Sequence, residues 1–223
     1  MKIPKGLRWF VNSVSLIETK IERILQALDA VKEGIMIPLV RRFCPDWLSP
    51  NHVTGSRGIV GLGVIAWLIA TGGTSYQNNN WFAVLVIFLC ATDFLDGLIA
   101  RAKNQKSRFG SFFDKVVDKL LILPLGTVEF WPLDQPLVIL SIGGTVVVLI
   151  TATYKYLQGK SEVPENIFGR VGMILYSLGI IIAIWPDYQP FAWKLAWLGC
   201  GFGFCSIILN FGRHFGLSGY IHE

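Results

Sequence analysis

Two neighbouring runs decide the fold: Asp93-Phe-Leu-Asp96-Gly97-Leu-Ile-Ala100-Arg101 and Gly110-Ser-Phe-Phe-Asp114-Lys-Val-Val-Asp118. They place four aspartates between long apolar segments, one before the first run and one after the second. A carboxylate at membrane depth is costly, so aspartates in such a setting indicate a functional site. Four of them cannot all ionise together without counter-charge. The hard cations Mg²⁺ and Mn²⁺ prefer oxygen ligands and would supply that charge.

The spacing of these residues predicts a site between two helices. In each run the aspartates recur every three or four residues, which places them on one helix face. A short polar turn, residues 102–109, joins the runs, so two antiparallel helices would bring the aspartate pairs together near one membrane surface. Gly97, Ala100 and Gly110 let a ligand approach the backbone, and Arg101 offers a cation for phosphate oxygens. The pattern indicates metal-dependent phosphoryl transfer.

The full pattern is Asp-x2-Asp-Gly-x2-Ala-Arg-x8-Gly-x3-Asp-x3-Asp, running from Asp93 to Asp118. It resembles the signature of the CDP-alcohol phosphotransferase family, which are integral membrane enzymes of phospholipid synthesis. The alternative is that the aspartates cap helices or pair with Lys115 and Lys119. Eight fixed residues at fixed spacing favour the family signature over that alternative.

The composition is that of a membrane protein. Of the 223 residues, 52% are hydrophobic and only 16% are charged. We predict an all-α, polytopic membrane domain over residues 51–223, preceded by an amphipathic juxtamembrane region over residues 1–50. Six transmembrane helices are expected near residues 58–71, 81–100, 112–130, 137–156, 171–185 and 192–211.

The distribution of charge predicts the orientation in the membrane. The loops at residues 72–80, 129–135 and 186–190 contain no Lys or Arg. The alternate loops and their flanks are basic, with Arg101, Lys103, Lys106 and Arg108 in one and Lys155, Lys160 and Arg170 in the other. Both termini and the aspartates are therefore expected in the cytosol. The net charge of +5 fits a basic collar beside anionic lipid headgroups and requires no nucleic acid.

The N-terminal region has apolar residues in alternating steps of four and three from Phe10 to Ile35. This predicts an amphipathic helix that lies on the membrane surface or on the helix bundle. A coiled-coil contact between protomers is the alternative, and we expect a homodimer. No cleavable signal peptide is expected, because the first residues lack a continuous apolar run.

The sequence Pro50-Asn51-His-Val-Thr54-Gly-Ser-Arg57 enters the first expected span and resembles the stretch that many family members use beside the cytidine. The amide of Asn51 and the hydroxyl of Thr54 offer hydrogen bonds suited to a base and a ribose. The alternative is a helix start with Asn51 as its N-cap.

The resemblance implies the reaction: an acceptor hydroxyl attacks the β-phosphorus of CDP-diacylglycerol, and CMP leaves. Asp93, Asp96 and Asp114 would hold two divalent ions, Mg²⁺ or Mn²⁺. Asp118 would take the acceptor's proton and also touch a metal. The nucleotide would be held by Asn51, Thr54, Gly97, Ala100, Arg101, Ser107 and Gly110.

The identity of the acceptor is the least specified part of the predicted reaction. A phosphorylated acceptor needs cations, and the available set is Lys155, Lys160 and Arg170; their alternative role is to set topology only. Gly169-Arg170 begins like the run of glycerol-phosphate-using members, and the following residues depart from it. We predict glycerol 3-phosphate, with inositol phosphate or another polyol as the alternative. A cation transporter is the alternative of another class, although its charges should lie near mid-bilayer.

Overall fold

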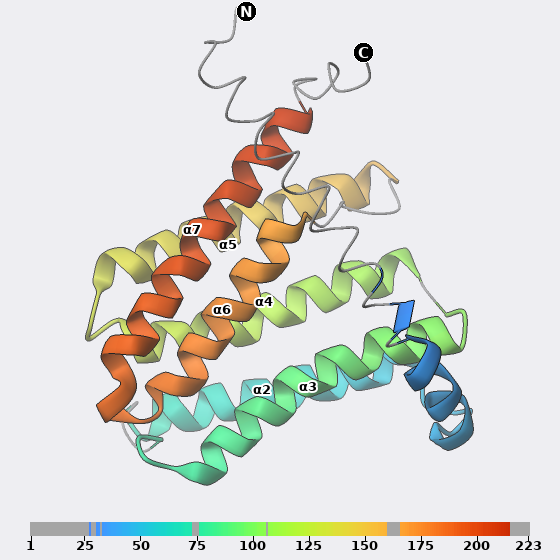
Figure 1. Ribbon diagram of the computed structural model, residues 1–223, viewed down its shortest axis with the longest axis horizontal. Coiled ribbons are helices and arrows are strands. Elements are labelled where there is room, and N and C mark those ends of the chain that lie inside the picture. The colour runs from blue at the N-terminus through green and yellow to red at the C-terminus, as the bar shows by residue number, and fades with distance from the viewer. Residues whose placement is uncertain are drawn as a thin grey trace, which may run out of the picture.

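Every regular element that the structure describes is helical, which confirms the all-α prediction. The computed structural model describes residues 27, 30, 31, 33–72, 76–105, 107–159 and 166–214, without the side chains of Phe94 and of 211–214. The elements are α2 (Pro50–Ala70), α3 (Asn80–Ala102), α4 (Arg108–Phe130), α5 (Gln135–Leu157), α6 (Ile167–Ala183), η1 (Pro186–Tyr188) and α7 (Gln189–His214) (Figure 1). Residues 33–43 form a further helix; the predicted apolar positions before residue 27 lie outside the described residues.

Polar side chains start the helices as capping rules require. At α2 the Ser49 hydroxyl accepts from the His52 N–H, while the His52 ring nitrogen accepts from the Ser49 N–H. This reciprocal capping box, with Pro50 in the first turn, fixes where the helix begins. Ser49 is therefore the N-cap, and the alternative role of Asn51 as N-cap is wrong. The later helices are capped by the side chains of Asn79, Ser107, Asp134 and Asn166.

Within the part of the chain that the structure describes, four segments are long and apolar enough to cross a membrane: α2, α3, α5, and the stretch Pro186–Asn210 that contains most of α7. The apolar helix α6 is shorter, at 17 residues. Helix α4 lies where a span was predicted but carries Lys, Arg, Asp and Glu along its length. The helices α2 to α7 thus coincide with the six predicted spans, although the criterion of length and hydropathy is met by four.

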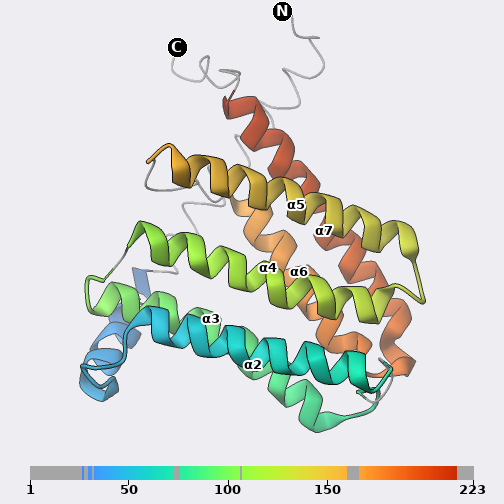
Figure 2. The same cartoon turned by 180° about the vertical axis from the view of Figure 1, so that it is seen from behind.

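The helices pack in two groups that α5 and α4 connect. Helix α2 packs on α3 and α4, α6 packs along α7, and α5 contacts both α4 and α7 (Figures 1 and 2). Glycines permit the close α6–α7 contact, because a Cβ on Gly172 would lie 2.8 Å from the Gly199 carbonyl oxygen. Small residues at such positions let membrane helices approach backbone to backbone.

The apolar core lies at the end of the bundle away from the aspartates. Its fully buried side chains include Leu68 near the end of α2, Phe130 at the end of α4 and Leu137 at the start of α5. Near this end Asp134 accepts from the Leu137 N–H and from the indoles of Trp193 and Trp197. These donors hold the pKa of Asp134 below its ordinary value. These hydrogen bonds join the start of α5 to α7 at the apolar end of the bundle. The aspartates lie away from this end.

Candidate active site

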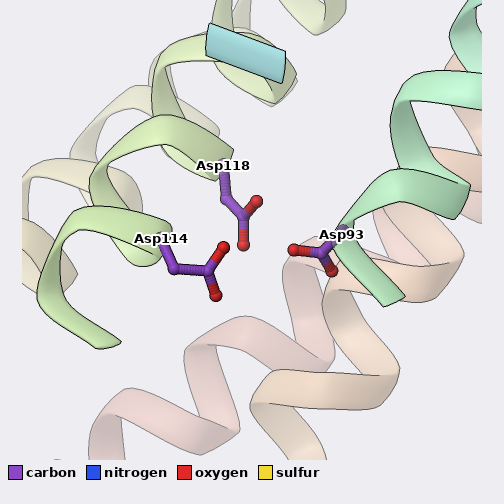
Figure 3. A group of neighbouring side chains, drawn as sticks. All are labelled: Asp93, Asp114 and Asp118. Carbon is purple, nitrogen blue, oxygen red and sulfur yellow. The ribbon is translucent and has the colours of Figure 1, made fainter. Parts of the chain in front are cut away.

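Aspartates from two helices converge in the half of the bundle that holds the turn between α3 and α4. Asp93 comes from α3, and Asp114 and Asp118 come from α4. Each offers one carboxylate oxygen, and these atoms lie within 4.8 Å of one another. Figure 3 shows the Asp93 carboxylate pointing across the gap toward the two aspartates of α4. The structure thus brings together residues that are 25 positions apart in sequence, as the helical spacing predicts.

A guanidinium from a third helix lies among these carboxylates. Arg57 of α2 is 3% exposed. Its Nη1 donates to Asp93 and lies 3.8 Å from Asp96. Its Nη2 lies 2.7 Å from both Asp114 and Asp118. The Arg57 guanidinium therefore faces four carboxylates, whose hard oxygen donors suit Mg²⁺ or Mn²⁺.

Asp96 is held differently from the other three aspartates. It is 5% exposed, and its Oδ2 accepts a 2.7 Å hydrogen bond from the Thr54 hydroxyl. The same hydroxyl lies 3.2 Å from the Pro50 carbonyl oxygen. Thr54 was predicted to contact the nucleotide, whereas in this structure its hydroxyl orients a carboxylate of the acidic cluster.

Close packing of α2 on α4 brings Arg57 within reach of the aspartates. A Cβ on Gly61 would lie 1.6 Å from Cδ2 of Leu121, and one on Gly58 would lie 3.6 Å from the methyl groups of Val117. Both glycines are on the α2 face that meets α4, directly after Arg57. A larger side chain at Gly61 would push the helices apart and draw the guanidinium away from Asp114 and Asp118.

Three of the predicted nucleotide-binding residues gather at the start of α4. The Ser107 hydroxyl accepts from the Gly110 N–H at 2.9 Å. A Cβ on Gly110 would meet Ser107 Oγ at 2.9 Å and Asn51 Oδ1 at 3.0 Å. Glycine is therefore needed for this close approach of α2 to α4, which brings the Asn51 amide and the Ser107 hydroxyl together around Gly110, four residues before Asp114.

Arg101 lies on the same side of α3 as Gly97. A Cβ on Gly97 would be 3.8 Å from Nη2 of Arg101, and Ala100 is half-buried. Nη1 of Arg101 lies 3.1 Å from the Glu33 carboxylate, and both side chains are partly exposed. Arg41 of the helix over residues 33–43 donates to the Ala102 carbonyl at this end of α3. Lys103 donates to the Pro45 and Leu48 carbonyls in the segment that follows that helix.

The proposed acceptor cations lie at the same end where the structure describes them. Lys155 is in the last turn of α5, next to Tyr156, whose ring stacks on Phe112 of α4 with centroids 4.8 Å apart. Arg170 is in the first turn of α6. Lys160 lies outside the described residues.

Arg57 is the site residue that sequence reasoning missed. Arg57 is the last residue of the pattern Pro-Asn-x-x-Thr-x-x-Arg, and the sequence predicts no contact between it and the aspartates. A signal was present, because Thr54 and Arg57 are three residues apart and so share a helix face. The two side chains of that face bind aspartates on other helices.

Comparison with known proteins gives one family. The sequence model described as CDP-alcohol phosphatidyltransferase matches residues 47–205, which is more than half of the chain. A CDP-diacylglycerol--glycerol-3-phosphate 3-phosphatidyltransferase of Aquifex aeolicus is 31% identical over 135 residues, which cover 59% of this chain and 72% of the relative. A relative of the same name from Shigella flexneri is 27% identical over 147 residues, 60% of this chain and 77% of the relative.

A putative cardiolipin synthase of Mycobacterium tuberculosis is similar at 26% identity over 137 residues. The match covers 58% of this chain and 63% of that relative, so the chain spans less than two thirds of its length. No solved structure was found to match.

Proposed function

Because the chain belongs to the CDP-alcohol phosphatidyltransferase family, we propose that it transfers a phosphatidyl group from CDP-diacylglycerol to an acceptor alcohol and releases CMP. The observation that carries this proposal is the convergence of Asp93, Asp114 and Asp118 on one guanidinium between three helices of a membrane bundle. A transporter is disfavoured, because the model of a phosphatidyltransferase family matches residues 47–205 of the chain.

The metal would be held by the acidic cluster. Asp93, Asp96 and Asp114 are the proposed ligands of two divalent ions, Mg²⁺ or Mn²⁺, with Asp118 as a shared ligand. Bound there, a divalent cation would neutralise the charge of the diphosphate and of the leaving CMP. The fixed Thr54–Asp96 hydrogen bond supports one ligand of this set before substrate arrives.

Asp118 is the proposed general base. The acceptor oxygen forms a bond to the β-phosphorus, the bond from that phosphorus to the CMP oxygen breaks, and the hydroxyl proton passes to the Asp118 carboxylate. Asp118 lies one turn along α4 from Asp114 and faces the same gap. Its position beside the other carboxylates supports a role at the reacting atoms.

The nucleotide would lie between the starts of α2 and α4 and the end of α3. Asn51 and Ser107 offer polar groups beside Gly110, and Arg101 offers a cation beside Gly97 and Ala100. Thr54, whose hydroxyl donates to Asp96, is also proposed to contact the nucleotide.

Glycerol 3-phosphate is the proposed acceptor. The relatives from Aquifex aeolicus and Shigella flexneri carry that acceptor in their names, and Lys155, Lys160 and Arg170 would meet its phosphate. The second candidate is cardiolipin synthesis, because a mycobacterial relative is named for it. Inositol phosphate or another polyol is a further alternative acceptor.

We also propose that α2 to α7 all cross the membrane, with both termini and the acidic cluster in the cytosol. The absence of Lys and Arg from the loops at 72–80, 129–135 and 186–190 supports this orientation. The homodimer expected from the sequence stays a prediction.

The test is CMP release by the purified protein in lipid nanodiscs. The assay offers CDP-diacylglycerol and Mg²⁺ with glycerol 3-phosphate, inositol phosphate or a phospholipid acceptor. We expect the fastest release with glycerol 3-phosphate. Release with the phospholipid acceptor alone would favour cardiolipin synthesis, and no release with any acceptor would overturn the proposed enzyme.

A further inference from the structure

Arg57 reaches the acidic cluster from a helix that supplies none of its carboxylates. It projects from α2, whereas the aspartates come from α3 and α4. Both terminal nitrogens of its guanidinium contact carboxylates. Its Nε is buried without a hydrogen-bond partner among the described residues. Carboxylates are therefore the groups that hold the guanidinium in place.

The contacts of Arg57 coincide with the proposed metal ligands. Asp93, Asp114 and Asp118 are the three residues whose oxygens gather within 4.8 Å. Each of them gives one carboxylate oxygen to Arg57. A divalent ion that takes these oxygens would share its ligands with a positive guanidinium, and the two cations would repel each other.

The cluster also needs a cation when no metal is present. The Arg57 side chain is 1% exposed, whereas those of Asp93, Asp114 and Asp118 are 44%, 34% and 15% exposed. Removing one partner of these ion pairs leaves the remaining charges uncompensated. Arg57 supplies that cation to two helices at once, since Nη1 faces α3 and Nη2 faces α4. It therefore joins α2, α3 and α4 in the metal-free protein.

We propose that Arg57 is a built-in counter-cation that competes with the divalent metal for Asp93, Asp114 and Asp118. It lowers the affinity of the site for metal and keeps the bundle stable when the metal is absent. This proposal rests on the proposed metal site. It makes Arg57 a positioning residue that tunes metal exchange, and it separates the role of this arginine from that of Arg101, which faces Glu33.

The experiment measures Mn²⁺ binding and stability directly. Wild type, Arg57→Gln and Arg57→Lys are purified with Mn²⁺, stripped with chelator and titrated with Mn²⁺ while electron paramagnetic resonance reports the free ion. Thermal unfolding is followed in chelator and in Mn²⁺. The matched control is Arg108→Gln, which removes the same charge at the start of α4. The Arg108 side chain donates a hydrogen bond to the Tyr156 carbonyl oxygen at 3.4 Å.

For Arg57→Gln we expect the Mn²⁺ dissociation constant to fall at least about tenfold, because a repelling cation is gone. Its melting temperature in chelator should fall by about 5 °C or more, and Mn²⁺ should restore it. For Arg108→Gln both values should stay near wild type, with affinity changed by less than about twofold.

Arg57→Lys keeps the inference testable if Arg57→Gln does not fold. A lysine keeps the charge but has one compact ammonium, so it cannot contact both helices as the planar guanidinium does. We expect Mn²⁺ to bind Arg57→Lys about threefold tighter than wild type, because one ammonium competes for fewer carboxylates.

The outcomes separate two failures. Mn²⁺ affinity that is unchanged or weaker in the Arg57 variants, with wild type binding Mn²⁺, would overturn the competition and leave the proposed function standing. Wild type that binds no Mn²⁺ would overturn the proposed metal site itself.

Discussion

Helix α4 carries acidic side chains in its first half and in its last turn, and the two groups have different partners. In the first half Asp114 and Asp118 contact Arg57 together with aspartates of α3. At the other end Glu129 is 4% exposed, lies beside the apolar core and pairs with the Tyr76 hydroxyl. Glu129 is a single acid beside a hydroxyl, and one of its carboxylate oxygens is buried without a hydrogen-bond partner among the described residues. The four aspartates instead cluster around a shared guanidinium, and this cluster of hard oxygen donors distinguishes a cation site from an isolated buried acid.

The largest effect that tests this comparison is expected at Asp118. Asp118→Asn keeps the size of the side chain but removes the proton acceptor, so CMP release should fall by about 100-fold or more while nucleotide binding survives. The control at the other end of α4 is Glu129→Gln, which should change CMP release less than about threefold because Glu129 touches no proposed substrate group. Both are measured by CMP release at saturating substrates. The assignment of roles would be wrong if Asp118→Asn abolished metal and nucleotide binding as strongly as Asp93→Asn.

The next prediction tests whether Arg170 binds the phosphate of the acceptor near the acidic cluster. Arg170→Ala should raise the acceptor KM about ten- to a hundredfold, since a charge-assisted hydrogen bond to phosphate contributes roughly 1.5–3 kcal/mol. The KM for CDP-diacylglycerol should change little. The measurement is an acceptor titration at saturating CDP-diacylglycerol. An unchanged acceptor KM would assign Arg170 to topology and weaken the case for a phosphorylated acceptor.

A smaller effect tests how the close packing of α2 on α4 places Arg57 beside the aspartates. Gly61→Ala places a methyl group against Leu121, so the free energy of unfolding should fall by about 1–3 kcal/mol. Displacement of Arg57 should then change Mn²⁺ binding as well. The matched control is Gly63→Ala, where a Cβ would meet nothing within 4 Å. Equal unfolding midpoints for the two variants in detergent would show that close α2–α4 packing is not required.

The smallest expected effect concerns Glu33. Its carboxylate lies 3.1 Å from Arg101, the cation proposed for the diphosphate. Glu33→Gln should lower the KM for CDP-diacylglycerol by about two- to threefold, because a partly exposed ion pair contributes little. Asp46→Asn, in the same N-terminal segment, is the matched control. A higher KM in Glu33→Gln would mean that Glu33 orients Arg101 for binding rather than occupying it.

The sequence predicted those features that depend on local spacing. The aspartates of α3 and α4 repeat with the helical period, so their common face and their approach across a short turn could be predicted. The contacts of Arg57 and Thr54 could not, because they depend on how closely α2 packs on α4. That distance is set by Gly61 against Leu121, a pairing of residues 60 positions apart. The Glu33–Arg101 pair was missed for the same reason, since it joins separate segments.

The central claim is that the clustered aspartates of α3 and α4 form a catalytic metal site. Its most direct test measures how CMP release depends on the added metal ion. The purified protein is treated with chelator, supplied with CDP-diacylglycerol and glycerol 3-phosphate, and then titrated with Mg²⁺ or Mn²⁺. We predict no CMP release after chelation and full recovery with either ion, with no recovery in Asp93→Asn. Undiminished CMP release in the chelated protein would contradict the claim.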